Sequence, residues 1–114
     1  MRNSTIFDER LALNMTDLNA VSDTLGPGRI GRCLQSNITI AWGPSCTAGV
    51  LEIQFSHSQL FPETPIVINV VPCPGPSQTH VEEIPSKYLG GFVRVKVTTA
   101  IDGNGVSIWA QGRR

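Results

Sequence analysis

The C-terminal stretch from Gly91 to Arg114 constrains the fold most strongly, because it holds two runs in which apolar and polar residues alternate. Between the runs lie residues 102–105, Asp-Gly-Asn-Gly, which tolerate positive φ and are typical of tight turns. We therefore expect a β-hairpin in which Ile101 pairs with Val106. In that register one face is apolar: Val93, Val95, Val97, Ile101, Val106, Ile108 and Ala110. The other face carries Arg94, Lys96, Thr98, Trp109 and Gln111, which must meet water or a partner.

Length and composition indicate one domain of the all-β class. The 114 residues are 40% hydrophobic, enough for a single modest core. Eleven glycines and eight prolines are spread among short Val/Ile/Thr runs, a composition typical of many short strands joined by turns. The net charge is zero, which disfavours nucleic acid or an anionic membrane as the main partner. No apolar run approaches the roughly 18–20 residues that span a bilayer, so we expect a soluble, unprocessed chain.

Three further strands are expected in the middle of the chain. Residues 36–42 alternate with Ile38, Ile40 and Trp42 on one face, and residues 50–56 alternate in the same way. Residues 65–71 are apolar on nearly both faces, which predicts a strand covered by the core on one side and by the arm or a neighbour on the other. The prolines that follow, within residues 72–79, predict a stiff loop.

Residues 1–31 carry few strand signals. Residues 6–14 could form a helix or an extended segment, but the apolar positions keep no clean 3.6-residue spacing and many of the polar residues are weak helix formers. We expect an extended N-terminal arm, lying on its own domain or on a neighbouring subunit. The predicted fold is therefore a β-sandwich with jelly-roll-like connections (residues 32–114) and an arm (residues 1–31).

No motif points to catalysis or to a metal. His57 and His80 are the two histidines, but no Gly-x-Ser-x-Gly motif accompanies them and the carboxylates show no ligand spacing. We therefore expect no enzyme activity, no cofactor and no metal site, with a hydrolase using His57 or His80 as the minor alternative. Cys33, Cys46 and Cys73 lack a Cys-x-x-Cys spacing and are expected to be reduced thiols, with a Cys33–Cys46 disulfide as the alternative.

Both ends of the chain resemble small virion proteins of tailed bacteriophages. Residues 91–101, followed by Gly-x-Gly and Val-Ser-Ile-Trp at 106–109, are similar to the closing hairpin of phage head β-sandwiches. Residues 8–13 and 18–24 resemble the opening of podovirus-type cement proteins. The middle, residues 50–58, resembles a strand that often ends in Ser-x-Asp, and His57-Ser58 departs from that pattern.

This resemblance implies a capsid cement or decoration protein, a homotrimer on the outside of the virion that is made in the host cytoplasm and binds the major capsid protein. Such a clamp would stabilise the shell against the pressure of packed DNA. The residues we expect at contacts with the capsid or a neighbouring subunit are Ile6, Phe7, Leu11 and Leu13 of the arm, together with Arg94, Lys96 and Trp109.

The alternative function is a carbohydrate-binding, lectin-like module of a phage tail fibre or surface protein. An indole surrounded by cations and amides suits a sugar platform as well as a protein interface. Trp109 could also pack against the arm of its own chain.

Overall fold

Antiparallel strands make up most of the fold in the computed structural model, which describes residues 5–113, except for the side chains of Thr5, Ile6 and Arg32. The strands are β1 (Thr5–Met15), β2 (Gln35–Trp42), β3 (Val50–Ser56), β4 (Ile66–Pro72), β5 (Thr79–Glu83), β6 (Phe92–Thr99) and β7 (Val106–Arg113). The short 3-10 helices are η1 (Ile30–Arg32) and η2 (Ser86–Tyr88). The predicted all-β class is confirmed.

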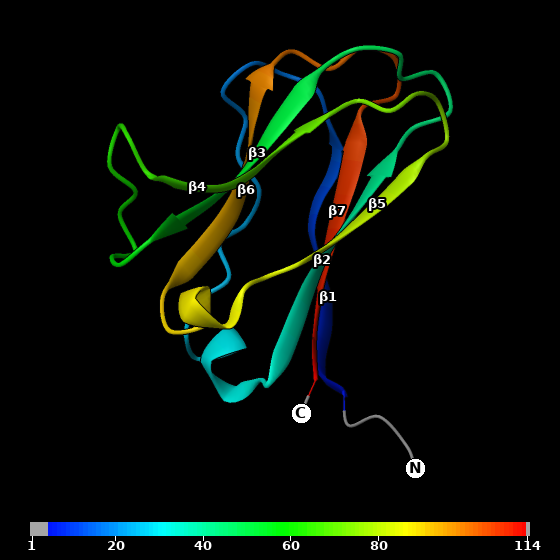
Figure 1. Ribbon diagram of the computed structural model, residues 1–114. Helices are drawn as coiled ribbons and strands as arrows, with labels where there is room; N and C mark the ends of the chain where they lie inside the picture. Colours follow the sequence, from blue (N-terminus) through cyan, green and yellow to red (C-terminus); the bar gives the residue numbers. More distant parts are fainter. Residues whose placement is uncertain (1–4, 114) are drawn as a thin grey trace.

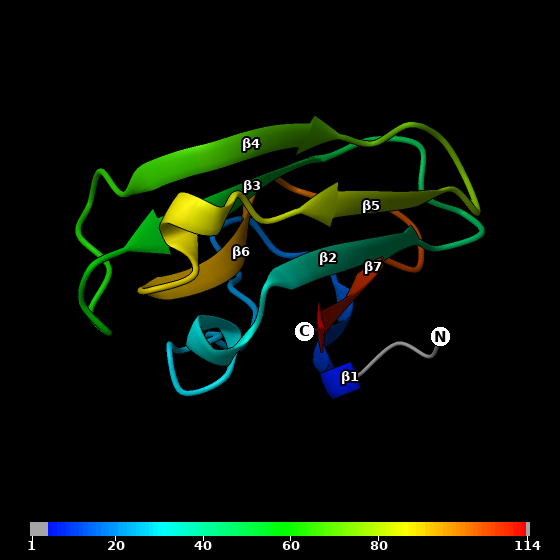
Figure 2. The same cartoon turned by 60° about the horizontal axis from the view of Figure 1, so that its bottom comes forward.

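The strands form two sheets that pack face to face (Figures 1 and 2). The four-stranded sheet has the order β1-β7-β2-β5, and the three-stranded sheet has the order β4-β3-β6. The molecule measures 38 × 37 × 18 Å, and its short dimension suits two layers about 10 Å apart. The predicted β-sandwich is therefore confirmed, while the jelly-roll-like connections stay a prediction.

One core fills the space between the sheets, and each sheet contributes alternate residues of its strands. The residues with no exposed surface include Ile38, Ile40, Leu51, Ile53, Val93, Val95, Val97, Val106 and Ile108. Every residue that the sequence placed on the apolar face of the C-terminal stretch is buried. Burying each of these branched side chains contributes roughly 1.5–3 kcal/mol, so this shared core is the main source of stability.

The predicted C-terminal hairpin is wrong, because β6 and β7 belong to different sheets (Figure 1). β6 pairs with β3, whereas β7 lies between β1 and β2. The six residues 100–105 cross from one sheet to the other, with Ile101 buried beneath them. Alternation requires only that one face be buried, and two strands facing each other across a core satisfy it as well as two paired strands do.

The crossing loop is fixed by hydrogen bonds to residues 45–48. The Asp102 carboxylate accepts the Thr47 hydroxyl, the Thr47 N–H (2.7 Å) and the Ala48 N–H (3.0 Å). Gly103 has φ +62°, and a Cβ there would lie 2.4 Å from the Ser45 carbonyl oxygen, so only glycine fits. The hydrogen bond from the Thr47 hydroxyl has the largest effect on Asp102, followed by the bonds from the Thr47 and Ala48 N–H groups. Together they hold the pKa of Asp102 below its ordinary value of 3.8.

Residues 5–31, the segment predicted as an arm, lie on this chain's own sandwich in two pieces. β1 pairs with β7, with three register shifts along its length. Residues 19–25 then cross to the other sheet and run along β6, where Ser22 N–H donates to the Val95 carbonyl (2.8 Å) and Leu25 N–H to the Val93 carbonyl (2.8 Å). Leu11, Met15, Leu25 and Ile30 are buried in the common core. The edge of β6 is thereby covered.

The alternative Cys33–Cys46 disulfide is wrong. Cys33, Cys46 and Cys73 form no disulfide within the described residues. Cys33 precedes β2 and Cys46 follows it, so the eight residues of the strand, at about 3.3 Å each, keep the two sulfurs far apart. The Cys46 thiol instead donates to the carbonyls of Asp102 (3.1 Å) and Gly105 (2.9 Å) and helps to hold the crossing loop.

We predict that Asp102→Asn lowers the melting temperature at neutral pH, because the amide loses the charge-assisted bonds to Thr47 and Ala48. The folded pKa lies below the unfolded one, so the carboxylate stabilises the fold above the unfolded value. This contribution is lost as the pH falls through the lowered pKa. Thermal unfolding should therefore show a gap between wild type and variant at pH 7 that closes below about pH 4.

Asp23→Asn is the matched control, since Asp23 is exposed and its carboxylate accepts no hydrogen bond from the described residues. A gap that keeps the same size from pH 7 to pH 3 would contradict this role for the Asp102 charge.

Candidate functional site

The three residues expected together on one face, Arg94, Lys96 and Trp109, lie on opposite sides of the molecule. Arg94 and Lys96 are on β6 and point out from the three-stranded sheet, because Val93, Val95 and Val97 point in. Trp109 is on β7 and points out from the four-stranded sheet. The expected cluster is therefore wrong, for the same reason as the hairpin: β6 and β7 do not pair. The protein has two outer faces of different chemistry.

Trp109 lies near the middle of the outer face of the four-stranded sheet. The register puts it between Arg10 of β1 and Thr39 of β2, and Thr39 in turn lies opposite Val81 of β5. These four side chains form a row across the whole sheet, and Val81 is 59% exposed. The indole is half-buried, and within residues 5–113 no acceptor binds its N–H. The row offers an aromatic and aliphatic strip beside the Arg10 guanidinium, which also has no bonding partner among these residues.

A polar row runs beside this strip and is held by its own hydrogen bonds. The Gln111 side-chain oxygen accepts the Thr39 hydroxyl (3.0 Å), and its NH₂ group donates to the Asp8 carboxylate (3.3 Å). These bonds fix the amide in one orientation. The face around Trp109 is therefore preorganised, which lowers the entropy lost when a partner binds.

The outer face of the three-stranded sheet is organised around Arg94. Its Nε donates to the side-chain oxygen of Gln54 (3.0 Å), and the Gln54 NH₂ group donates to Glu52 (3.0 Å). The Phe61 ring covers the guanidinium, with 4.1 Å between Cζ and the ring centroid. Burial lowers the pKa of the Arg94 guanidinium from its usual value, and an arginine stays charged at neutral pH. Arg94 is thus held in place, with part of its donor capacity unused.

The arm residues expected at partner contacts differ in their exposure. Leu11 is only 4% exposed and belongs to the core, so its side chain is not available to a neighbour. Phe7 is half-buried against the core, and a Cβ at Gly112 would lie 2.3 Å from its ring. Leu13 is exposed. The side chain of Ile6 lies outside the described residues. Of the described arm residues that the sequence assigned to partner contacts, Leu13 offers the most free surface.

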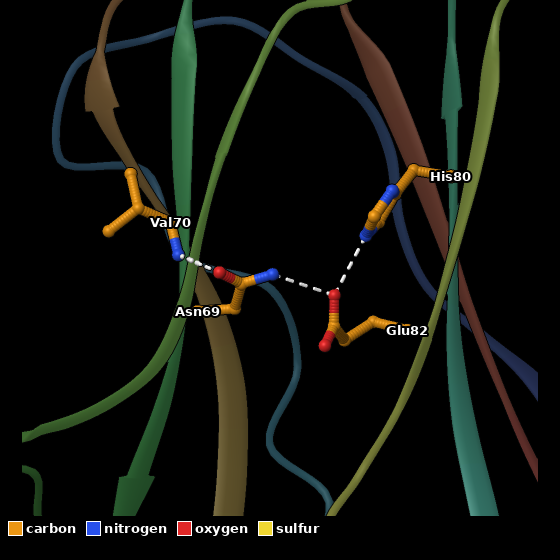
Figure 3. Close-up of polar contacts among 4 residues, drawn as sticks. All are labelled: Asn69, Val70, His80 and Glu82. Atoms are coloured by element: carbon orange, nitrogen blue, oxygen red, sulfur yellow. Dashed lines mark hydrogen bonds and ion pairs between the residues drawn. The ribbon is translucent and has the colours of Figure 1, made fainter.

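The two histidines lie in separate places. His80 and Glu82 are on β5. The Glu82 carboxylate accepts hydrogen bonds from His80 Nε2 (2.8 Å) and from the side-chain NH₂ group of Asn69 on β4 (2.8 Å), as Figure 3 shows. His57 follows β3 and packs edge-on against Phe55, 4.9 Å between ring centroids. No hydroxyl or thiol bonds to either ring in the described part of the chain. A nucleophile and its base are not paired here.

A shallow hollow of about 320 Å³ lies beside His57, lined mainly by Phe55, Leu60, Pro62 and Ile66. The serine hydroxyls in its wall bond to the backbone of the loop. Ser56 Oγ accepts the Ser58 N–H (3.1 Å), and Ser58 Oγ accepts the Leu60 N–H (3.2 Å). These are local turn bonds. The hollow can take an apolar group but presents no activated nucleophile.

Between residues 5 and 113, no group of three or more His, Cys, Asp or Glu side chains is placed to hold a metal ion. The helices found between residues 5 and 113 are too short and polar to cross a membrane.

The link between Asn69 and Glu82 was not expected from the sequence. It joins edge strands of the two sheets, β4 and β5, on the side of the sandwich that residues 19–25 do not cover (Figure 3). Asn69 Oδ1 also accepts the backbone N–H of Val70 (2.9 Å), and Pro72 has no N–H to donate. A strand docking on β4 would therefore miss two donors, a common protection of sheet edges. The one sequence signal was a polar residue in an otherwise apolar strand.

Comparison of the chain with protein-family models, curated proteins and solved structures finds no match.

We predict that Asn69→Ala promotes self-association, because it frees the Val70 N–H at the β4 edge and removes the bond to Glu82. Stability should fall by roughly 0.5–1.5 kcal/mol, the usual net value of one hydrogen bond. Light scattering after size exclusion, over a range of concentrations, measures the first effect, and denaturant unfolding measures the second. Asn37→Ala on β2 is the control, and equal mass distributions for the two variants would contradict the capping role.

Proposed function

We propose that this protein is a structural virion protein, a capsid cement or decoration protein that binds the assembled shell from outside. Two things support the proposal: the sequence resemblance to podovirus-type cement proteins, and the arrangement of the surface. The broad side of the block measures 38 × 37 Å, larger than the roughly 800 Å² that each partner contributes to a standard interface. Neither histidine meets a nucleophile, so surface contact is the activity that the geometry favours.

The observation that carries the proposal is the row Arg10, Trp109, Thr39 and Val81 on the four-stranded sheet. Interfaces concentrate their binding energy in a few central aromatic and arginine residues. Here an indole stands near the middle of a flat sheet face, with an arginine beside it and polar side chains already fixed around it. A flat, preorganised face suits a flat target such as the outer surface of a shell.

Binding that requires the assembled shell would stabilise it by mass action, without any catalytic group. A homotrimer would add avidity, since three copies of one weak face act together. The exposed Leu13 next to this sheet is the arm residue that we assign to such contacts.

We predict that Trp109→Ala weakens attachment to shells by about tenfold or more, because truncation of a central tryptophan usually costs 2 kcal/mol or more. Shells assembled from the major capsid protein of the same genome would be sedimented with wild type or variant. Leu34→Ala is the control, since Leu34 is highly exposed and lies outside the Trp109 row. Equal occupancy of shells by Trp109→Ala and wild type would argue against this face.

The second candidate is a carbohydrate-binding module with Trp109 as its platform. The Trp109 indole N–H, which has no acceptor within the described residues, and the amide of Gln111 beside it favour this function, because sugars stack on aromatic rings and bond to fixed polar groups. A glycan array separates the two functions. Glycan binding that Trp109→Ala abolishes while the melting temperature is kept would favour the lectin, and binding to shells without glycan binding would favour the cement protein.

A further inference from the structure

Within the described residues, the Phe61 ring covers the outer face of the three-stranded sheet at Arg94, but the margins of this face stay open, although the sequence of β4 predicts a cover. β4 is apolar on both sides, and its outward residues Val67 and Val70 remain 41% and 51% exposed. Val21, opposite Lys96 on the far side of β6, is 47% exposed. The face therefore has apolar groups along both margins. Its members are Val67 and Val70 of β4, Glu52 and Gln54 of β3, Arg94 and Lys96 of β6, and Val21.

The middle of this face carries a net charge of +1, because Arg94 and Lys96 contribute +2 and Glu52, opposite Lys96 in the register, contributes −1. The ion pairs formed within residues 5–113 are Arg29–Glu9 and His80–Glu82, so neither Arg94 nor Lys96 has a carboxylate partner there. Glu52 is the one acidic member of the face, and its carboxylate already accepts the Gln54 amide. Arg94 and Lys96 are both half-buried, which strengthens their interaction with a carboxylate brought close to them.

We propose that this second face binds an acidic patch on a partner protein, with carboxylates meeting Arg94 and Lys96 while Val21, Val67 and Val70 pack against apolar groups around them. The proposal rests on the proposed function and assigns a docking face to it, separate from that of Trp109. A cement protein with two unlike faces can touch two surfaces at once, for instance two capsid subunits or a capsid subunit and a neighbouring copy.

Charge decides against two other occupants. Two cations in a chain of zero net charge make a poor surface for nucleic acid, which is bound through many phosphates. A second copy related by a two-fold axis would bring this face of net positive charge against an identical face, and like charges in an interface cost energy. An acidic patch has neither difficulty.

The test measures binding to the same shells as salt is raised and as the cations are removed. Wild type should lose affinity between about 50 and about 500 mM salt, because the shorter Debye length screens the pairs. Lys96→Gln should weaken binding about two- to fivefold, and Arg94→Gln/Lys96→Gln about tenfold, with a flatter salt dependence. Lys87→Gln removes the same single charge as Lys96→Gln at an exposed site off both proposed faces, and should bind as wild type.

Each outcome decides something. The Lys96 ammonium makes no hydrogen bond to another described residue, so Lys96→Gln should fold as wild type does. This single variant keeps the test valid if the double variant is unstable. Wild-type binding that ignores both salt and the Arg94/Lys96 variants would overturn this inference and leave the proposed function standing. Failure of the wild type to bind shells at all would overturn both. Salt-sensitive self-association, lost in the double variant without any shell binding, would identify a second copy as the occupant instead.

Discussion

Burial of alternate β-branched residues between two sheets is the interaction on which the rest of this structure depends. Val93, Val95 and Val97 of β6 come from one layer, and Val106 and Ile108 of β7 come from the other. Each strand gives one face to the core and leaves the other outside. This single requirement fixes the orientation of every outward side chain, including Trp109 on one side and Arg94 and Lys96 on the other.

The connection between β6 and β7 decides how that burial is achieved. Residues 100–105 carry the chain across the core, and Asp102 ties the crossing to residues 47 and 48. Cys46 adds two weak bonds from beneath. Without these contacts the same residues would be able to fold back into a hairpin, which is what their turn-prone composition alone suggests.

The two open sides of the sandwich are closed by different means. On one side residues 19–25 run along β6 and satisfy its backbone groups. On the other side Asn69 caps a backbone N–H of β4 and reaches Glu82 of β5. Pairing of β6 and β4 with strands of another molecule is thereby discouraged.

The sequence by itself determined the all-β class, most strand positions and the buried face of these strands. Successive residues of a strand point to opposite sides, so alternation of apolar and polar residues predicts directly which side is buried. The sequence did not determine which strands pair: the pattern of residues 93–110 fits a hairpin and two facing strands equally well.

Only the tertiary structure decided that Trp109 lies on the opposite side from Arg94 and Lys96 and that Leu11 belongs to the core. It also decided that Asn69 caps a backbone N–H on the edge strand β4. Those facts depend on contacts between residues far apart in the chain. Local alternation holds no information about which layer a strand joins, since either layer buries the same atoms.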